Sequence, residues 1–208
     1  MIKKIHPKDR LRQLFQDKGV VRLSEISKAG IHSQYVHRLC ESGEIVKSSR
    51  GIYSSANFDF TEHHSIAEAC QRATSGVICL MSALFFHGLT TQIPGKICVA
   101  IGIKNHKPQI SYPPVSIFRF SRTCLKEGVE EHIVEGVQIR VTNPARTVVD
   151  CFKYRHKIGL DVAIEALHDV FREGRATYDE ILHFAKLCRM KNIITPYLET
   201  IAWKQSEH

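Results

Sequence analysis

Three polar side chains in the first quarter of the chain have the chemistry needed to contact nucleic-acid bases. Gln34, His37 and Arg38 carry an amide, an imidazole and a guanidinium group at helical spacing. Such groups hydrogen-bond the base edges that distinguish one DNA sequence from another. A helix face meant for solvent alone more often carries paired Glu and Lys side chains. The pattern therefore predicts that these three residues bind bases of double-stranded DNA.

A helix over residues 33–42 is needed to hold these side chains on one face, and the sequence supports it. Ser33 is a candidate N-cap, and Gly43 can end the helix. The apolar residues recur at spacings of one, three and four, which places them in a single stripe. The stripe consists of Tyr35, Val36, Leu39 and Cys40, and it leaves Gln34, His37, Arg38 and Glu41 on the opposite face.

The neighbouring segments complete a winged helix-turn-helix pattern. A helix over residues 8–18 comes first, a short helix over 23–29 with Ser24 as a possible N-cap follows, and strands at 44–47 and 51–53 come last. In this arrangement the second helix of the pair enters the major groove, and the hairpin, or wing, reaches the backbone or minor groove. Ser33, Lys47 and Arg50 are therefore predicted to contact phosphates or the minor groove. The same pattern also fits a helical hairpin and β-ribbon that only pack against another part of the protein.

The charge of the chain favours a polyanionic partner. The 208 residues have a formal net charge of +8. Residues 1–60 hold 11 Lys and Arg against 6 Asp and Glu, a net of +5, and the remainder holds 18 against 15, a net of +3. The excess of positive charge is thus concentrated where the DNA contacts are predicted, as expected for an electrostatic footprint on nucleic acid.

Cysteine usage and hydropathy predict a cytoplasmic protein. The seven cysteines are odd in number, scattered, and free of any C-x-x-C spacing, so they indicate small buried hydrophobes in a reducing compartment. The basic start of the chain lacks the apolar core and cleavage site of a signal peptide. No run of eighteen apolar residues is present, so we expect no membrane span.

The whole chain predicts an α+β protein in which a mixed domain with a small sheet and several helices follows the winged helix-turn-helix. We place the DNA-binding domain at residues 1–56, a linker at 57–62 and a C-terminal domain at 63–208. The apolar run Val77–His87 predicts either a buried strand followed by a helix or a buried helix. Further strands are expected at 97–101, 115–120, 130–134 and 137–141, and further helices at 65–73, 145–154, 160–172, 178–188 and 196–203.

The inventory of reactive side chains favours a protein that is not an enzyme and has no cofactor or metal site. A metal-dependent nuclease needs clustered carboxylates, whereas Asp150, Asp161 and Glu165 have helical spacings that suit surface pairs or a cap. His63 and His64 are adjacent, with no second pair at zinc-site spacing, and we expect them to face solvent in the linker region. Phosphate-binding-loop and nucleophile-elbow motifs are absent from the sequence.

A few residues of the second domain leave structural and functional interpretations open. His87 ends an apolar run and fits a histidine that hydrogen-bonds backbone or stands at a helix C-terminus. Asn143–Asp150 is either a functional motif or a capped helix with an Arg146–Asp150 ion pair. Basic residues outside the winged module either extend the nucleic-acid surface or are simply solvated; these are Lys104, Lys107, Arg119 and Arg122.

Three blocks of the sequence resemble the AbiE-type antitoxins, transcriptional regulators of type IV toxin–antitoxin and abortive-infection phage defence systems. The first block is the N-terminal winged module with Gly51–Tyr53 closing the wing. The second is MSALFFHGLT at residues 81–90, followed by Pro94 and the strand at 97–100. The third is VQIRVTNPARTVVD at residues 137–150, running into GLDVA at 159–163.

The resemblance implies a two-domain regulator. Its N-terminal domain would bind inverted repeats in the promoter of its own operon and repress transcription. Its C-terminal domain would counteract a nucleotidyltransferase-like toxin without a stable toxin–antitoxin complex. Without the resemblance, the sequence leaves two other functions open. One is a nuclease or nucleic-acid-modifying enzyme targeted by the winged helix, and the other is an effector-binding regulator whose pocket is lined by the apolar run from Val77.

Overall fold

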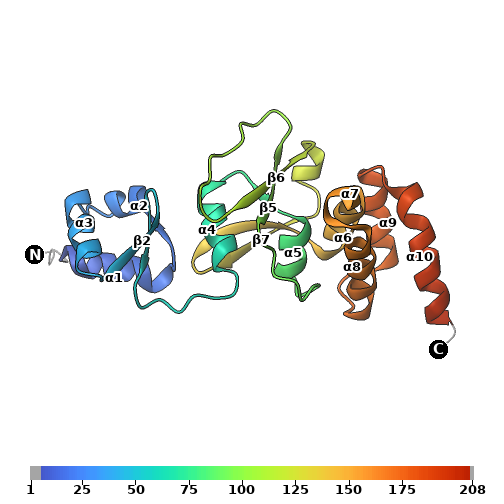
Figure 1. Ribbon diagram of the computed structural model, residues 1–208, viewed down its shortest axis with the longest axis horizontal. Helices are drawn as coiled ribbons and strands as arrows, with labels where there is room; N and C mark the ends of the chain where they lie inside the picture. The colour runs from blue at the N-terminus through green and yellow to red at the C-terminus, as the bar shows by residue number, and fades with distance from the viewer. Residues whose placement is uncertain (1–5, 207–208) are drawn as a thin grey trace, which may run out of the picture. The chain divides into compact units, whose positions relative to one another are not determined.

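The computed structural model describes residues 6–206 (Figure 1). These residues form two compact units. Unit 1 contains the described residues up to Thr74 together with Gln109–Pro113 and His132–Ile139. Unit 2 contains Ser75–Pro108, Pro114–Glu131 and the described residues from Arg140 onward. The α+β class predicted from the sequence is confirmed, while the domain boundaries at residues 56 and 62 stay a prediction.

Unit 1 begins with the predicted winged helix-turn-helix. Its elements are α1 (Pro7–Asp17), β1 (Val21–Arg22), α2 (Leu23–Lys28), α3 (Ser33–Glu41), β2 (Ile45–Ser49) and β3 (Ile52–Ser55). The strands form an antiparallel sheet in the order β1-β3-β2. The three helices pack through a shared apolar core that includes Leu11, Phe15, Ile26, Val36 and Leu39. Burial of these side chains is what holds such short helices in place, because helices of this length are marginal alone.

Histidines cap α1 and α3, and neither of the two serine caps predicted for α2 and α3 is present. His32 Nδ1 accepts a hydrogen bond of 3.3 Å from Gln34 N at the start of α3. His6 Nδ1 accepts one of 3.3 Å from Lys8 N at the start of α1. The prediction that Ser33 caps α3 is therefore wrong, because Ser33 is the first helical residue. Ser24 likewise lies inside α2, whose N-cap is Arg22.

In unit 1, α4 (His64–Arg72) contacts the turn at Glu135–Gly136, which joins β7 (Val129–Val134) to β8 (Val137–Thr142). The Glu135 carboxylate accepts hydrogen bonds from Thr61 N at 2.8 Å and Thr61 Oγ1 at 2.9 Å, and it lies 2.8 Å from His64 Nδ1. Its side chain is 1 % exposed. The prediction that His63 and His64 face solvent is wrong, since their side chains are 20 % and 23 % exposed and His64 is engaged by a buried carboxylate.

Unit 2 contains most of a mixed five-stranded sheet in the order β6-β5-β4-β8-β7. Its strands are β4 (Val77–Ile78), β5 (Ile97–Gly102), β6 (Val115–Phe120), β7 (Val129–Val134) and β8 (Val137–Thr142). The first alternative for the apolar run from Val77 is confirmed, because β4 leads directly into α5 (Leu80–Phe86). His87 follows as the C-cap and bonds Thr142 O through Nε2 at 2.8 Å, as its position predicted.

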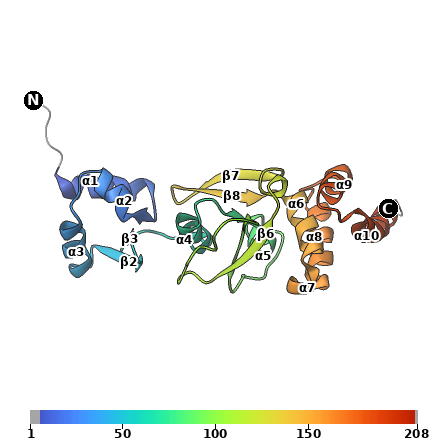
Figure 2. The same cartoon turned by 90° about the horizontal axis from the view of Figure 1, so that it is seen from above.

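Helices complete unit 2 (Figure 1). They are α6 (Pro144–Lys153), α7 (Arg155–Ile158), α8 (Leu160–Arg172), α9 (Tyr178–Leu187) and α10 (Lys191–Ser206), with a short 3-10 turn, η1 (Thr123–Leu125), before β7. Helix α6 is the central one, because α5, α7, α8, α9 and α10 all contact it. In the second view α7 and α8 again lie beside α6 (Figure 2). Helix α10 begins five residues before the predicted start at Pro196, which lies inside it.

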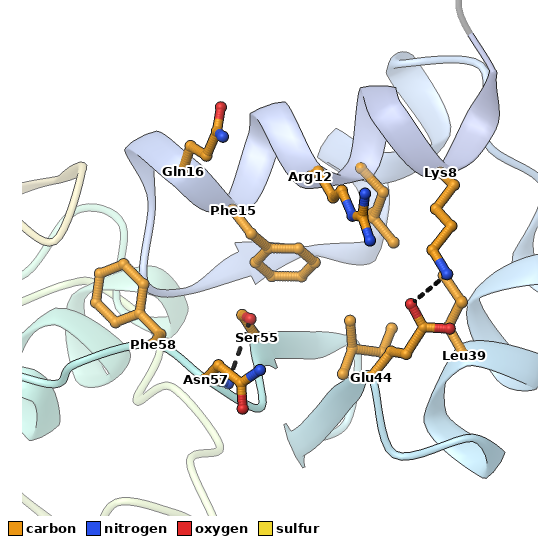
Figure 3. Close-up of a pocket in the computed structure, with 11 residues that line it drawn as sticks. Lys8, Arg12, Phe15, Gln16, Leu39, Glu44, Ser55, Asn57 and Phe58 are labelled. Atoms are coloured by element: carbon orange, nitrogen blue, oxygen red, sulfur yellow. Dashed lines mark hydrogen bonds and ion pairs between the residues drawn. The ribbon is translucent and has the colours of Figure 1, made fainter.

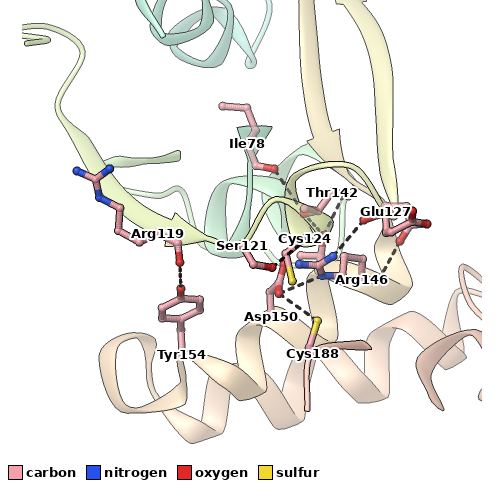
Figure 4. A network of polar contacts seen from close by, with 12 residues as sticks. Ile78, Arg119, Ser121, Cys124, Glu127, Thr142, Arg146, Asp150, Tyr154 and Cys188 are labelled. Carbon is pink, nitrogen blue, oxygen red and sulfur yellow. Dashed lines mark hydrogen bonds and ion pairs between the residues drawn. The ribbon is translucent and has the colours of Figure 1, made fainter. Parts of the chain in front are cut away.

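The helix start predicted at Asn143 is confirmed. It places the buried Arg146 side chain in the first turn of α6. Asn143 Oδ1 accepts from Arg146 N at 2.8 Å, and Pro144 takes the first helical position. One turn later Arg146 Nε bonds Asp150 Oδ1 at 3.1 Å, with both side chains 0 % exposed (Figure 4). The expectation that Asp150 forms a surface pair is therefore wrong. The pair is internal to the unit because α6 is covered on several sides, with α5, α8 and α9 packed against it.

Further contacts surround this ion pair. Arg146 Nη1 donates to Glu127 O at 3.0 Å, and its guanidinium carbon lies 5.6 Å from the Phe120 ring centre. The Cys188 thiol lies 3.9 Å from Asp150 Oδ1 (Figure 4). Burial raises the pKa of Asp150 to about 6 even though the adjacent Arg146 opposes the shift. Arg146 Nη2 and Asp150 Oδ2 have no hydrogen-bond partner among the described residues.

We predict that removing one partner of this pair costs more than replacing both. Arg146→Met should lower the free energy of unfolding by about 3–5 kcal/mol, because it leaves a buried carboxyl group without its countercharge. The double variant Arg146→Met/Asp150→Leu should recover much of that loss. Urea unfolding of the wild type, both single variants and the double variant measures this. A double variant no more stable than Arg146→Met would contradict the interpretation.

The raised pKa of Asp150 predicts a pH dependence. Its folded pKa of about 6 lies above the ordinary 3.8, so the folded state binds the proton more tightly than the unfolded chain. The resulting stability is complete below the ordinary value and is lost as pH rises through about 6. The stability of the wild type relative to Asp150→Asn should therefore fall between pH 4 and pH 7. Urea titrations at several pH values test this, and a constant difference would refute it.

Candidate nucleic-acid interface

Helix α3 presents one apolar and one polar face, as predicted. Val36 and Leu39 are 1 % and 6 % exposed and pack into the module core. Ser33, Gln34, His37 and Arg38 are all exposed. The polar face borders a concave surface lined by His32, Gln34, Tyr35, His37, Arg38 and Glu41. Buried apolar side chains thus fix the orientation in which the polar side chains are displayed.

Within the described part of the chain, Arg38 and His37 of α3 have only weak partners. The Arg38 guanidinium carbon lies 5.1 Å from the Tyr35 ring centre, a stacking contact that leaves its N–H groups available to a ligand. His37 Nδ1 lies 3.6 Å from Glu41 Oε1, but both side chains are strongly exposed. Exposed pairs of this kind contribute little energy. The face can therefore exchange its internal contacts for base edges at small cost.

The wing displays the two other predicted basic residues. Lys47 lies on β2 opposite Tyr53, and Arg50 lies in the turn between β2 and β3; both are exposed. The next residue, Gly51, has φ of +75°, a conformation that disfavours residues with a side chain. Its carbonyl accepts a hydrogen bond of 2.9 Å from Leu23 N, which ties the wing turn to the start of α2.

All six predicted DNA-contacting residues therefore belong to unit 1. Ser33, Gln34, His37 and Arg38 share α3, and Lys47 and Arg50 share the wing. Sequence reasoning missed Arg22 and Arg72, which line a cavity together with Arg50. The sequence pattern did not point to Arg22 because this residue comes before the first helix of the helix-turn-helix pair. It did not point to Arg72 because this residue belongs to α4, which lies outside the predicted DNA-binding domain at residues 1–56.

A second cavity lies among α1, α3 and the wing (Figure 3). It has a volume of about 360 Å³ and an apolar floor that includes Leu11, Phe15 and Phe58. The Lys8–Glu44 ion pair, with 2.8 Å between Nζ and Oε2, stands at its rim. The predicted effector pocket along the run from Val77 is not this cavity, because Val77, Leu80 and Leu84 fill the core of unit 2.

The basic residues of unit 2 have different environments. Arg119, on β6, points its Nη1 at the loop after β5, where it bonds Gly102 O at 2.8 Å and also the carbonyl of Asn105. It therefore braces that loop. Lys104, Lys107 and Arg122 are exposed.

Burial raises the pKa of the Cys79 and Cys151 thiols well above the usual range, in keeping with their predicted role as small hydrophobes.

Two properties of the described part of the chain concern metals and membranes. Within residues 6–206, His, Cys, Asp and Glu side chains do not gather in groups of three or more that could hold a metal ion. Over the same residues, every helix is too short or too polar to cross a membrane.

Comparison with known proteins supports both the fold and the module. The crystal structure of the RV2827C protein from Mycobacterium tuberculosis superposes with a TM-score of 0.60 over 86% of this chain and 71% of that chain. The two sequences are 13% identical, so the likeness shows a common fold. No curated protein sequence matches the chain.

Residues 9–56 match the family model described as "Transcriptional regulator, AbiEi antitoxin". These residues span α1 to the end of the wing and contain all six predicted DNA-contacting side chains. The match confirms the resemblance for the first of its three blocks, and residues 9–56 are similar to the AbiE-type antitoxin family of transcriptional regulators.

Proposed function

We propose that this protein is an antitoxin that binds inverted repeats in the promoter of its own operon and represses transcription. The observation that carries the proposal is the exposed face of α3, where amide, imidazole and guanidinium groups stand on a helix whose opposite side is buried. The match of residues 9–56 to a family of transcriptional regulators supports it independently. The net charge of +8 adds a general attraction for DNA.

The mechanism follows from the chemistry of each side chain. With α3 in the major groove, Arg38 can donate two hydrogen bonds to guanine, and the Gln34 amide can both donate to and accept from adenine. His37 adds a donor or acceptor on the same face. Ser33, Lys47 and Arg50 contact phosphates or the minor groove and fix the register without reading sequence. An inverted repeat then calls for two copies of the chain related by twofold symmetry.

The antitoxin activity would reside in residues 63–208. By resemblance, this part counteracts a nucleotidyltransferase-like toxin of a type IV system in abortive phage infection, and no stable complex forms between the two proteins. A neighbouring gene for such a toxin, whose toxicity is relieved by co-expression of this chain, would support the assignment. Unchanged toxicity on co-expression would refute it.

We predict that Arg38→Ala reduces specific promoter binding by about 1–3 kcal/mol, because one base contact is lost. Lys47→Ala should weaken binding to all duplexes alike, since it removes a phosphate contact. Fluorescence anisotropy with a promoter duplex and a scrambled duplex separates the two effects. If the combined Arg38→Ala/Lys47→Ala variant bound the promoter as tightly as the wild type, the assigned surface would be wrong.

Binding should also weaken steeply with salt, because each phosphate contact releases counterions from the DNA. The slope of log K against log salt should be about −0.9 for each phosphate neutralised. The Lys47→Ala variant should have a slope smaller in magnitude by about 1. Titrations between low and physiological salt measure this, and a slope near zero would argue against backbone contacts by the wing.

A further inference from the structure

A cavity of about 300 Å³ lies at the base of the wing in unit 1. Three different elements supply its walls: the end of β1 with the start of α2, the turn between β2 and β3, and the last turn of α4. Its lining residues are Arg22, Leu23, Ser24, Arg50, Gly51, Ile52, Gln71 and Arg72. Three of them are arginines and none is acidic, so the cavity is strongly positive.

Direct hydrogen bonds hold the three elements against one another. Leu23 N donates to Gly51 O at 2.9 Å, which joins α2 to the wing turn. Arg72 Nη2 donates to Arg50 O at 3.3 Å, and Gln71 Nε2 donates to Val20 O at 3.3 Å. The last turn of α4 is therefore fixed to the wing and to the segment before β1. The positions of Arg22, Arg50 and Arg72 around the cavity are set by backbone contacts.

Within residues 6–206, the charges of Arg22, Arg50 and Arg72 are only partly offset, because among these three Glu25 interacts with the charge of Arg22 alone. Glu25 is the carboxylate next to Arg22, but its oxygens accept from Lys18 Nζ at 2.5 Å and from Arg22 N at 2.9 Å. Arg72 Nε is buried and has no hydrogen-bond partner among the described residues. A buried donor without a partner carries a free-energy cost that a ligand oxygen can relieve.

We propose that this cavity binds a backbone phosphate of DNA, and that Arg72 positions the wing on the duplex from outside the winged module. Guanidinium groups match phosphate geometry and can donate two parallel hydrogen bonds. Nucleic acid is the fitting source of the phosphate, because the cavity wall is the wing turn, the part of this fold that reaches the DNA backbone. The inference rests on the proposed DNA-binding function and extends it to α4.

Fluorescence anisotropy on the full-length chain tests the proposal. Arg72→Gln and Arg22→Gln should each weaken binding to promoter and scrambled duplexes by a similar factor and lower the magnitude of the salt slope by about 1. Arg172→Gln is the matched control: it makes the same charge change at a side chain 68 % exposed on α8, where it pairs with Asp169 and Glu173. That control should leave the slope unchanged. Arg72→Lys should retain most of the slope but bind less tightly than the wild type.

The outcomes distinguish this inference from the proposed function. If the wild type binds the promoter and both glutamine variants behave like Arg172→Gln, the phosphate site is wrong and promoter binding stands. If promoter and scrambled duplexes bind equally and both variants weaken them, the site stands and promoter recognition is wrong. A wild-type chain that binds no duplex overturns both. Melting temperatures check folding, and Arg22→Gln carries the test if Arg72→Gln alone unfolds.

Discussion

The Arg146–Asp150 ion pair is the interaction on which unit 2 is organised. Burying two opposite charges costs free energy, and their contact with each other offsets much of that cost even though Arg146 Nη2 and Asp150 Oδ2 have no partner among the described residues. Arg146 therefore has to reach Asp150 and also the carbonyl of Glu127, which ties α6 to the segment between η1 and β7. The Phe120 ring and the Cys188 thiol close the same site from β6 and the end of α9. One helix thereby fixes the sheet and the C-terminal helices together.

Unit 1 follows a different principle, in which apolar packing builds the module and polar contacts attach α4 to it. Val36 and Leu39 decide which side of α3 is free, because their burial leaves Gln34, His37 and Arg38 outward. Gln71 and Arg72 then bond backbone carbonyls of the winged module through their side chains. Such contacts add a basic group to the wing without altering its sheet. The proposed DNA-binding surface therefore extends beyond residues 9–56 to α4.

The sequence predicted the helices and strands well, because residues close together in the chain determine where these elements form. The stripe at Tyr35, Val36 and Leu39 and the Asn143–Pro144 helix start each depend on neighbouring residues alone. Helix caps were less certain, because His32 and Ser33 are both able to accept the first N–H groups and only the backbone geometry selects between them. The predicted start of α10 is five residues late, because proline is disfavoured inside a helix whereas this helix extends through Pro196.

The sequence by itself determined the α+β class, the winged module and the polar face of α3, since periodicity and glycine positions specify which side of a short helix is apolar. It also determined the uneven charge that points to nucleic acid. Tertiary structure alone decided that Arg146 and Asp150 are buried, that His64 meets Glu135, and that Arg22, Arg50 and Arg72 surround one cavity. These facts join residues far apart in the chain. Whether a charge is paired, solvated or left for a ligand depends on which distant elements pack against it.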